Sequence, residues 1–290
     1  MRATVTVPAT AANLGPGFDV FGLALGLVNE VTVDTAAAPA VAWEGEGAGE
    51  LPVDGTDMVS ATIAAVARSI RESPPPCAIR GVHAIPLERG LGSSSAAAVA
   101  GVVIASLLLD LGWDRDPWSV FAAAAEIEGH PDNAAPAVFG GFTVAMPDGF
   151  VRRCDPHPAL RPVAIVPPGR VVTDAARRAL PDRVDRGDAV FNVAHAALAV
   201  DAFTEDPSLL RRALQDRLHQ ATRIELGGLE DLTGALEADA IPWCVAGAGP
   251  TVLAFEDDEH PVDAAALALG EGWRILRPGV RTTGFEVRRG

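Results

Sequence analysis

Hydrophobic and polar residues follow one another in patterns that predict strands and helices along the whole chain. Residues 2–7 alternate between polar and apolar side chains, which is typical of a strand with one buried face. Residues 57–70 place Met58, Ile63 and Val66 on one side of a predicted helix. Further strands are predicted at residues 20–27, 31–35, 78–84, 140–146, 162–166, 243–246, 251–255 and 282–288. Further helices are predicted at residues 93–109, 118–128, 174–179, 189–202, 209–219 and 262–269. Because strands and helices do not alternate strictly, their order favours an α+β fold over a Rossmann sheet.

A change of composition past the middle of the chain predicts two domains. The 290 residues are enough for one large domain or two modest ones. Proline and charged residues gather over residues 148–162, as expected of a connection between domains. We therefore expect an N-terminal domain over residues 1–152 and a C-terminal domain over residues 153–290.

The charged residues exclude several classes of function. The formal net charge of -15 argues against a nucleic-acid partner, which requires a basic surface. The chain contains arginine but no lysine. P-loop nucleotide sites, protein-kinase sites and Schiff-base chemistry all depend on a lysine, so none of them is available. No segment holds the roughly 18 consecutive apolar residues of a membrane helix, and the first residues do not resemble a signal peptide. We therefore expect a cytoplasmic protein with no membrane partner.

The segment at residues 86–96 has the composition of a phosphate-binding loop followed by a helix. Gly90 and Gly92 allow the backbone to turn tightly and to approach a ligand closely. The serines that follow open the predicted helix, whose first N–H groups lack partners and carry partial positive charge. Taken alone, the segment fits an ordinary capped helix after a glycine turn equally well. The predicted ATP-binding residues are Pro86, Leu87, Glu88, Arg89, Gly90, Leu91, Gly92, Ser93, Ser94, Ser95 and Ala96.

Three further segments, taken with this loop, resemble the motifs of the GHMP-type kinases. Residues 8–19 read PATAANLGPGFD, residues 128–136 read EGHPDNAAP, and residues 246–251 read AGAGPT. In this order and spacing, the four segments resemble the homoserine branch of that family in particular. The resemblance spans nearly the whole chain, and four coinciding motifs are far more specific than a glycine- and serine-rich loop.

The resemblance implies both a fold and a reaction. The fold is the two-domain GHMP kinase fold, with an N-terminal domain like the second domain of ribosomal protein S5 and a C-terminal ferredoxin-like α+β domain. The reaction is ATP-dependent phosphorylation of the side-chain hydroxyl of L-homoserine to O-phospho-L-homoserine, on the route to threonine. ATP and Mg²⁺ would be the cofactors, and the family permits a homodimer, although no segment identifies an interface. Two alternatives stay open: a GHMP kinase for another small alcohol, such as a mevalonate-type or sugar substrate, and a catalytically silent relative that binds a ligand.

The resemblance also implies the roles of individual residues in catalysis and metal binding. Ser94 and Glu128 would hold the metal, since a hydroxyl and a carboxylate oxygen both suit Mg²⁺. Glu126 is a rival for Glu128, and the motif match favours Glu128. Asp132, in a predicted proline-containing loop, matches the base of other family branches. It is therefore a candidate base, while the acceptor hydroxyl could instead lose its proton to the transferring phosphate.

The homoserine site implied by the resemblance collects residues from four segments. Asp19 would meet the ammonium group, and two arginines would bind the carboxylate, because a guanidinium offers it two parallel hydrogen bonds. Arg178 is the alternative to Arg177 as the first of these arginines. Asn13 and Asp19 also fit ordinary turn chemistry. The predicted substrate-binding residues are Asn13, Asp19, His130, Asn133, Arg177 and Arg223.

Overall fold

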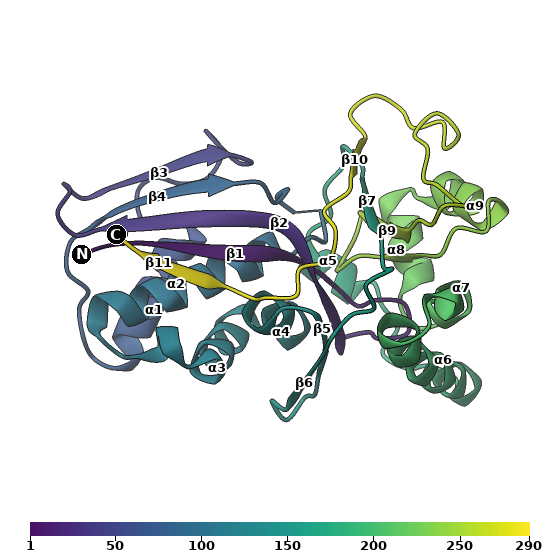
Figure 1. Cartoon of the computed structure of the whole chain (residues 1–290), viewed down its shortest axis with the longest axis horizontal. Helices are drawn as coiled ribbons and strands as arrows, with labels where there is room; N and C mark the ends of the chain where they lie inside the picture. The colour runs from purple at the N-terminus through teal and green to yellow at the C-terminus, as the bar shows by residue number, and fades with distance from the viewer.

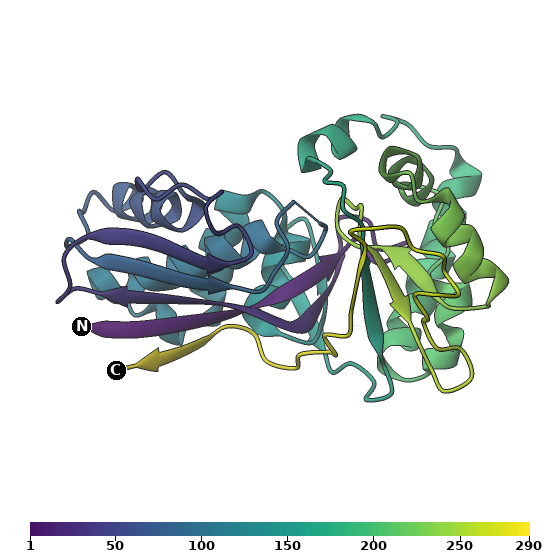
Figure 2. The same ribbon diagram turned by 90° about the horizontal axis from the view of Figure 1, so that it is seen from above.

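Two sheets, each covered by helices, make up the protein in a computed structural model that describes residues 1–290 (Figure 1). The first sheet has seven strands in the order β11-β1-β2-β4-β3, with β5 paired to β2 and β6 paired to β5. Its strands are β1 (Arg2–Ala12), β2 (Phe21–Asp34), β3 (Ala40–Gly45), β4 (Ala78–His83), β5 (Phe142–Ala145), β6 (Val151–Cys154) and β11 (Glu286–Arg289). Strands β1 and β2 are long, and their inner ends reach the second part of the molecule (Figure 2).

The helices of the first part pack on one face of this sheet (Figure 1). They are α1 (Met58–Ser69), α2 (Ser93–Leu109), α3 (Pro117–Glu128) and α4 (Pro131–Phe139), with a short 3-10 turn, η1 (Trp113–Arg115). Helix α2 is apolar on nearly every side, because it lies between α1, α3 and strand β1. Its Val99, Val102 and Val103 are fully buried in the main core. The start of α2 is therefore held rigidly where the phosphate loop precedes it.

The second sheet has four antiparallel strands in the order β10-β7-β9-β8. They are β7 (Pro162–Val166), β8 (Trp243–Val245), β9 (Val252–Phe255) and β10 (Arg274–Leu276). The accompanying helices are α5 (Thr173–Arg178), α6 (Arg186–Thr204), α7 (Leu210–Ala213), α8 (Gln220–Gly227) and α9 (Glu230–Ala238), with the 3-10 turn η2 (Pro207–Leu209). A small second core of ten buried residues, including Ile165, Leu232 and Val252, joins this sheet to its helices. The mixture of sheets and helices confirms the predicted α+β class.

Two strands that reach or lie beyond the predicted domain boundary belong to the first sheet. Strand β6 pairs with β5 and includes residues on both sides of the boundary after residue 152. Strand β11 pairs antiparallel with β1, so the two termini lie side by side (Figures 1 and 2). The division into domains at 1–152 and 153–290 stays a prediction, and the end of the second segment contributes a strand to the sheet of the first.

Several predicted elements match the structure closely, and others are wrong for identifiable reasons. Helix α2 and strand β7 have the predicted bounds. The predicted strands 20–27 and 31–35 form the single strand β2, and the predicted loop around residues 130–136 is the start of helix α4. Pro131 occupies the first turn of α4. Backbone N–H groups in a first turn have no partner within the helix, so a proline there costs no hydrogen bond.

Two predicted helices are shorter or absent. The predicted helix 209–219 ends at Ala213, and the carboxylate of Asp216 then accepts the backbone N–H groups of His219 and Gln220 to begin α8. The predicted helix 262–269 consists of turns, and Ala268 has a left-handed backbone with φ 48°. Strands β3, β6 and β10 and helices α8 and α9 were not predicted. No helix combines the length and the apolar character needed to cross a membrane.

Candidate active site

A cavity of about 360 Å³ lies where the first and second sheets meet, lined by residues from both parts of the chain. The phosphate loop, the start of α4, helix α5, helix α8 and the turn at residues 247–249 all contribute to its wall. Of the residues predicted for the site, all line this cavity except Ala96 and Asp19. Ala96 is instead buried in the main core, one turn into α2.

The phosphate loop is held by close backbone contacts on both sides. Gly92 precedes α2 with a left-handed backbone, φ 69°, and a Cβ there would collide with the hydroxyl of Thr10 on β1. A Cβ at Gly90 would collide with the carbonyl oxygen of Ala246. The hydroxyl of Thr251 donates to the carbonyl of Arg89, so the 246–251 turn supports the loop from the second sheet. The glycines are required because two other segments approach the loop without room for side chains.

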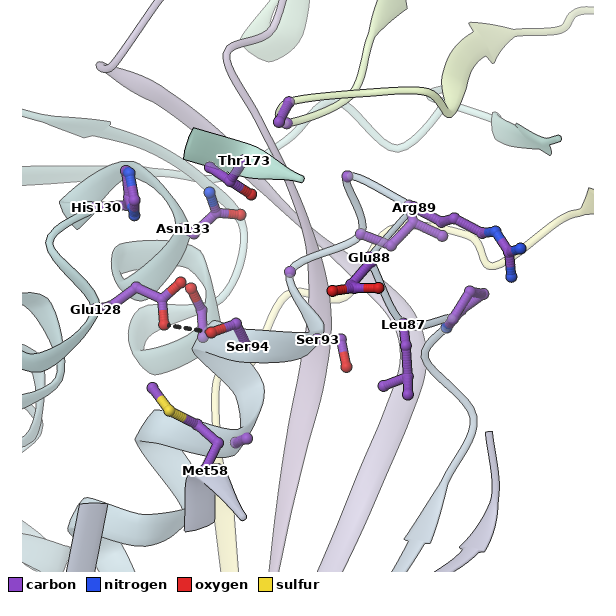
Figure 3. Close-up of a pocket in the computed structure, with 18 of the residues that line it drawn as sticks. Met58, Leu87, Glu88, Arg89, Ser93, Ser94, Glu128, His130, Asn133 and Thr173 are labelled. Carbon is purple, nitrogen blue, oxygen red and sulfur yellow. Dashed lines mark hydrogen bonds between the residues drawn. The ribbon is translucent and has the colours of Figure 1, made fainter. Parts of the chain in front are cut away.

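The positive character of this loop comes from its backbone. The Arg89 guanidinium donates to the carbonyls of Pro168 and Gly169, and in Figure 3 its side chain extends away from Ser94 and Glu128. The free N–H groups at the start of α2, with the dipole of a 17-residue helix behind them, then provide the anion site.

Ser94 and Glu128 meet at the edge of the cavity (Figure 3). The Ser94 hydroxyl donates to Glu128 Oε2 over 2.9 Å, joining the first turn of α2 to the last residue of α3. Burial raises the pKa of Glu128, while the Ser94 hydrogen bond and nearby His130 act in the opposite direction. Glu126 is exposed and does not line the cavity. The geometry therefore favours Glu128 over Glu126 beside Ser94.

The first turn of α4 brings three predicted residues to the cavity (Figure 3 labels His130 and Asn133). Asn133 accepts a hydrogen bond from the Thr10 hydroxyl over 2.9 Å, which fixes its amide against β1. Asp132 is 1% exposed, and its Oδ2 has no hydrogen-bond partner. Burial, followed by the charge of Asp19, raises the pKa of Asp132 to about 6. An unpaired buried carboxylate of this kind is typical of a functional site.

The turn after β1 contributes Asn13 to the wall of the cavity. Asn13 and Asp19 both have left-handed backbones, with φ 59° and 56°. Asn13 Oδ1 accepts a hydrogen bond from the backbone N–H of Asp19 over 2.8 Å. Asn13 therefore stabilises the turn and also lines the cavity. The Asp19 carboxylate accepts two hydrogen bonds from Arg177, at 2.8 and 2.9 Å. The residues predicted to bind opposite ends of one substrate therefore bind each other in this structure.

The two predicted arginines differ in their surroundings. Arg177 and its alternative Arg178 are both exposed, but Arg177 pairs with Asp19 and lines the cavity, whereas Arg178 does not line it. Arg223 is 3% exposed and has no carboxylate within salt-bridge distance. It donates to the carbonyl of Gly247, its Nε has no partner, and burial lowers its pKa to about 10. The charges of Asp19 and Asp132 reach Arg223 without direct contact, so a guanidinium that is buried at a cavity and has no carboxylate within salt-bridge distance favours an anion there.

A further lobe of the cavity was missed by sequence reasoning. Trp43 stacks on His83 with ring centroids 5.0 Å apart, and both line the cavity. Asp57 Oδ1 caps helix α1 through the N–H of Ser60, at 2.9 Å, and its Oδ2 is buried without a partner. The Nδ1 of His83 also lacks a partner, and burial lowers the pKa of this imidazole. These residues come from three separate elements, so only the capping role of Asp57 had a sequence signal.

Several known proteins resemble this chain in sequence and in fold. Residues 57–141 match the family described as the GHMP kinases N terminal domain. Homoserine kinase from Thermus thermophilus is 45% identical over 282 residues, covering 94% of each chain. Homoserine kinase from Corynebacterium kroppenstedtii is 40% identical over 285 residues, covering 94% of this chain and 91% of its own. The crystal structure of homoserine kinase from Cytophaga hutchinsonii superposes with a TM-score of 0.84 at 26% identity, covering 99% of this chain and 97% of its own. A putative sugar kinase from Campylobacter jejuni shares the fold, with a TM-score of 0.73 at 15% identity, covering 99% of this chain and 98% of its own.

Proposed function

The chain belongs to the homoserine kinases of the GHMP kinase family, and we propose on this premise that it transfers the γ-phosphoryl group of ATP to the side-chain hydroxyl of L-homoserine. The product is O-phospho-L-homoserine, an intermediate toward threonine. The observation that carries the choice of acceptor is Arg223, a buried guanidinium without a carboxylate partner in the cavity that also contains the phosphate loop. An amino-acid carboxylate would supply the missing negative charge.

The phosphates of ATP would bind the loop at residues 86–95 and the start of α2. Backbone N–H groups and the helix dipole favour them there without a lysine. Phosphoryl transfer depends mainly on positioning and on stabilising charge, which such a rigid loop provides. The base of ATP would occupy the lobe at Trp43 and Asp57. In that lobe, the unpaired Oδ2 of Asp57 suits the exocyclic amino group of adenine.

Ser94 and Glu128 fit a magnesium ion. Their oxygens already lie 2.9 Å apart at the cavity edge, and Mg²⁺ is usually bound by one or two carboxylates together with substrate phosphates. When bound, Mg²⁺ would neutralise charge that develops on the phosphate oxygens. Glu128 would then be ionised despite the burial that raises its pKa, since a divalent cation favours the charged form.

L-Homoserine would replace the internal ion pair between Asp19 and Arg177 with contacts of its own. Its ammonium group would pair with Asp19, and its carboxylate would lie between Arg177 and Arg223. Because the amino acid carries both an ammonium and a carboxylate group, Asp19 and Arg177 would each keep a partner of opposite charge after their own ion pair separates. Asn13, His130 and Asn133 would surround the remainder of the substrate.

The proton of the acceptor hydroxyl has two destinations. Asp132 is a candidate base, since a carboxyl group with a pKa of about 6 is ionised at neutral pH and is more basic than an ordinary aspartate. The alternative is direct transfer to the departing phosphoryl group, which requires no base from the protein.

A coupled assay of ADP release tests the acceptor. Wild-type protein with ATP and Mg²⁺ would be given L-homoserine, mevalonate or galactose in parallel, with a no-acceptor control. We expect turnover with L-homoserine alone. Turnover with another alcohol but none with homoserine would contradict the proposal in favour of another GHMP kinase, and no turnover with any acceptor would favour a catalytically silent relative. The homodimer and the cytoplasmic location stay predictions, and sedimentation of the purified protein would test the first.

A further inference from the structure

Phe18 contacts both of the arginines proposed to bind the substrate carboxylate. The guanidinium carbon of Arg223 lies 5.3 Å from the centre of its ring, and that of Arg177 lies 5.8 Å from it. Both distances fall within the range of a cation–π interaction. Phe18 itself does not line the cavity, whereas both arginines do. The contacts of Phe18 that lead to the cavity are therefore those with the two arginines.

The two guanidinium groups carry like charges. Burial is the main cause that lowers the pKa of Arg223, the charges of Asp19 and Asp132 act in the opposite direction, and the charge of Arg177 lowers it further. Arg177 is held by Asp19, but Arg223 has only the carbonyl of Gly247 as a hydrogen-bond partner. The negative face of an aromatic ring attracts both cations at once and adds no charge that would compete with an incoming carboxylate.

The Phe18 ring is itself fixed by a buried network. His219 stacks on it, with ring centroids 5.3 Å apart and planes inclined by 28°. His219 Nε2 bonds the carbonyl of Gly15 at 2.7 Å, and its backbone N–H donates to Asp216. Burial lowers the pKa of His219 to about 4, so the imidazole stays neutral near pH 7 and adds no third cation beside the ring. Arg223 follows His219 by one turn at the start of α8, so the imidazole that stacks on Phe18 and the Arg223 guanidinium are held by the same helix.

We propose that Phe18 is a positioning residue for the carboxylate of the acceptor: its ring contacts both Arg177 and Arg223 and orients the two guanidinium groups that would bind this carboxylate. This rests on the proposed function, since it assigns the carboxylate of an amino acid to the two arginines. It explains why an aromatic residue lies in the 13–19 turn between Gly17 and Asp19. The role depends on the face of the ring and not on its volume alone.

Steady-state kinetics of Phe18→Leu and Phe18→Tyr test this role. Phe18→Leu keeps an apolar side chain but removes the π face, and we expect it to raise KM for L-homoserine roughly tenfold, as loss of a partly desolvated cation–π contact predicts. The inhibition constant of L-2-aminobutyrate, which has the carboxylate but no hydroxyl, should rise by the same factor. The KM for ATP and kcat should stay within about twofold, because the phosphate loop is untouched. Phe18→Tyr keeps the ring and should restore KM to within about twofold of the wild-type value.

A matched control removes a cation–π contact elsewhere in the second part of the chain. Phe191 has the guanidinium carbon of Arg217 3.9 Å from its ring centre, and neither residue lines the cavity. Phe191→Leu should leave KM for homoserine unchanged. If Phe18→Leu does not fold, Phe18→Met serves in its place with the same expectations.

Three results would overturn the inference in an active enzyme: an unchanged KM for homoserine in Phe18→Leu, a Phe18→Tyr variant as impaired as Phe18→Leu, or an equal rise in KM for ATP. The last two would indicate a merely structural side chain. Failure of the wild-type protein to phosphorylate homoserine would instead contradict the proposed function, so the two failures are distinguishable.

Discussion

Replacing Asp132 with asparagine should raise the free energy of unfolding above that of the wild type at alkaline pH. At acidic pH the same substitution should have little effect. The folded protein keeps the Asp132 proton up to about pH 6, whereas an aspartate in the unfolded chain releases it near 3.8. Folding therefore carries an increasing cost as pH rises from 3.8 to 6, because above the unfolded pKa the carboxylate must either take up a proton or be buried charged. The cost is absent well below pH 3.8 and complete above about pH 7.

The size of this cost follows from the two pKa values. The difference between 3.8 and about 6 corresponds to about 3 kcal/mol at pH 8, and to about half of that at pH 5. An asparagine has no such titration, but its amide places a polar group at the position where Oδ2 already lacks a partner. That group costs roughly 1–2 kcal/mol at either pH. We therefore expect a net gain of about 1–2 kcal/mol at pH 8 and little or no gain at pH 5.

Urea denaturation followed by tryptophan fluorescence at the two pH values measures this difference. At each pH, the free energy of unfolding of the wild type is subtracted from that of Asp132→Asn. We expect this difference to change by about 1.5 kcal/mol between pH 5 and pH 8. The cost of the amide is the same at both pH values and therefore cancels. Asp182→Asn, at an exposed position, is the control and should show no such change. An equal effect of Asp132→Asn at both pH values would refute the inferred burial of an ionised carboxylate. The kcat of Asp132→Asn distinguishes the two destinations of the hydroxyl proton. A fall of about a hundredfold or more indicates that Asp132 is a base, and retained activity indicates transfer to phosphate.

Four other substitutions test three separate parts of the site. Ser94→Ala and Glu128→Gln should each lower kcat about a hundredfold, with partial recovery at high Mg²⁺ and with exposed Glu126→Gln as the unaffected control; full activity in both would remove the metal assignment. Arg223→Lys keeps the charge but loses the planar fork, so KM for homoserine should rise about tenfold or more while KM for ATP stays constant; an unchanged KM would place the carboxylate elsewhere. Asp57→Asn keeps the helix cap but puts an amide in place of an oxygen, so the ratio of kcat/KM for ATP to that for inosine triphosphate should fall; an unchanged ratio would place the base outside this lobe.

The parts of the fold that were predicted well are those whose causes are local. Helix α2 follows directly from two glycines, three serines and a long apolar run. The residues that begin α4 were predicted as a loop because they include prolines, although Pro131 in a first turn favours a helix. The turns at 262–269 show the reverse error, since alanines and leucines with helical spacing were not enough to form a helix there.

The site itself was predictable only where a motif marks it. The phosphate loop, Ser94 and Glu128 lie in such motifs, and the structure places them around one cavity. The pairing of Asp19 with Arg177 joins residues 158 positions apart, and no local pattern contains such a contact. The same holds for the lobe at Trp43 and for the contact of Phe18 with Arg223, because each depends on how distant elements pack.

Identification of the phosphorylated product distinguishes phosphoryl transfer to homoserine from hydrolysis of ATP. The protein would be incubated with ATP, Mg²⁺ and L-homoserine, and the mixture examined by phosphorus–proton correlation NMR. We expect a new phosphate monoester signal coupled to the two protons of the carbon that bears the side-chain oxygen of homoserine. A mixture that contains only ADP and inorganic phosphate, or ATP left intact beside unmodified homoserine, would contradict it.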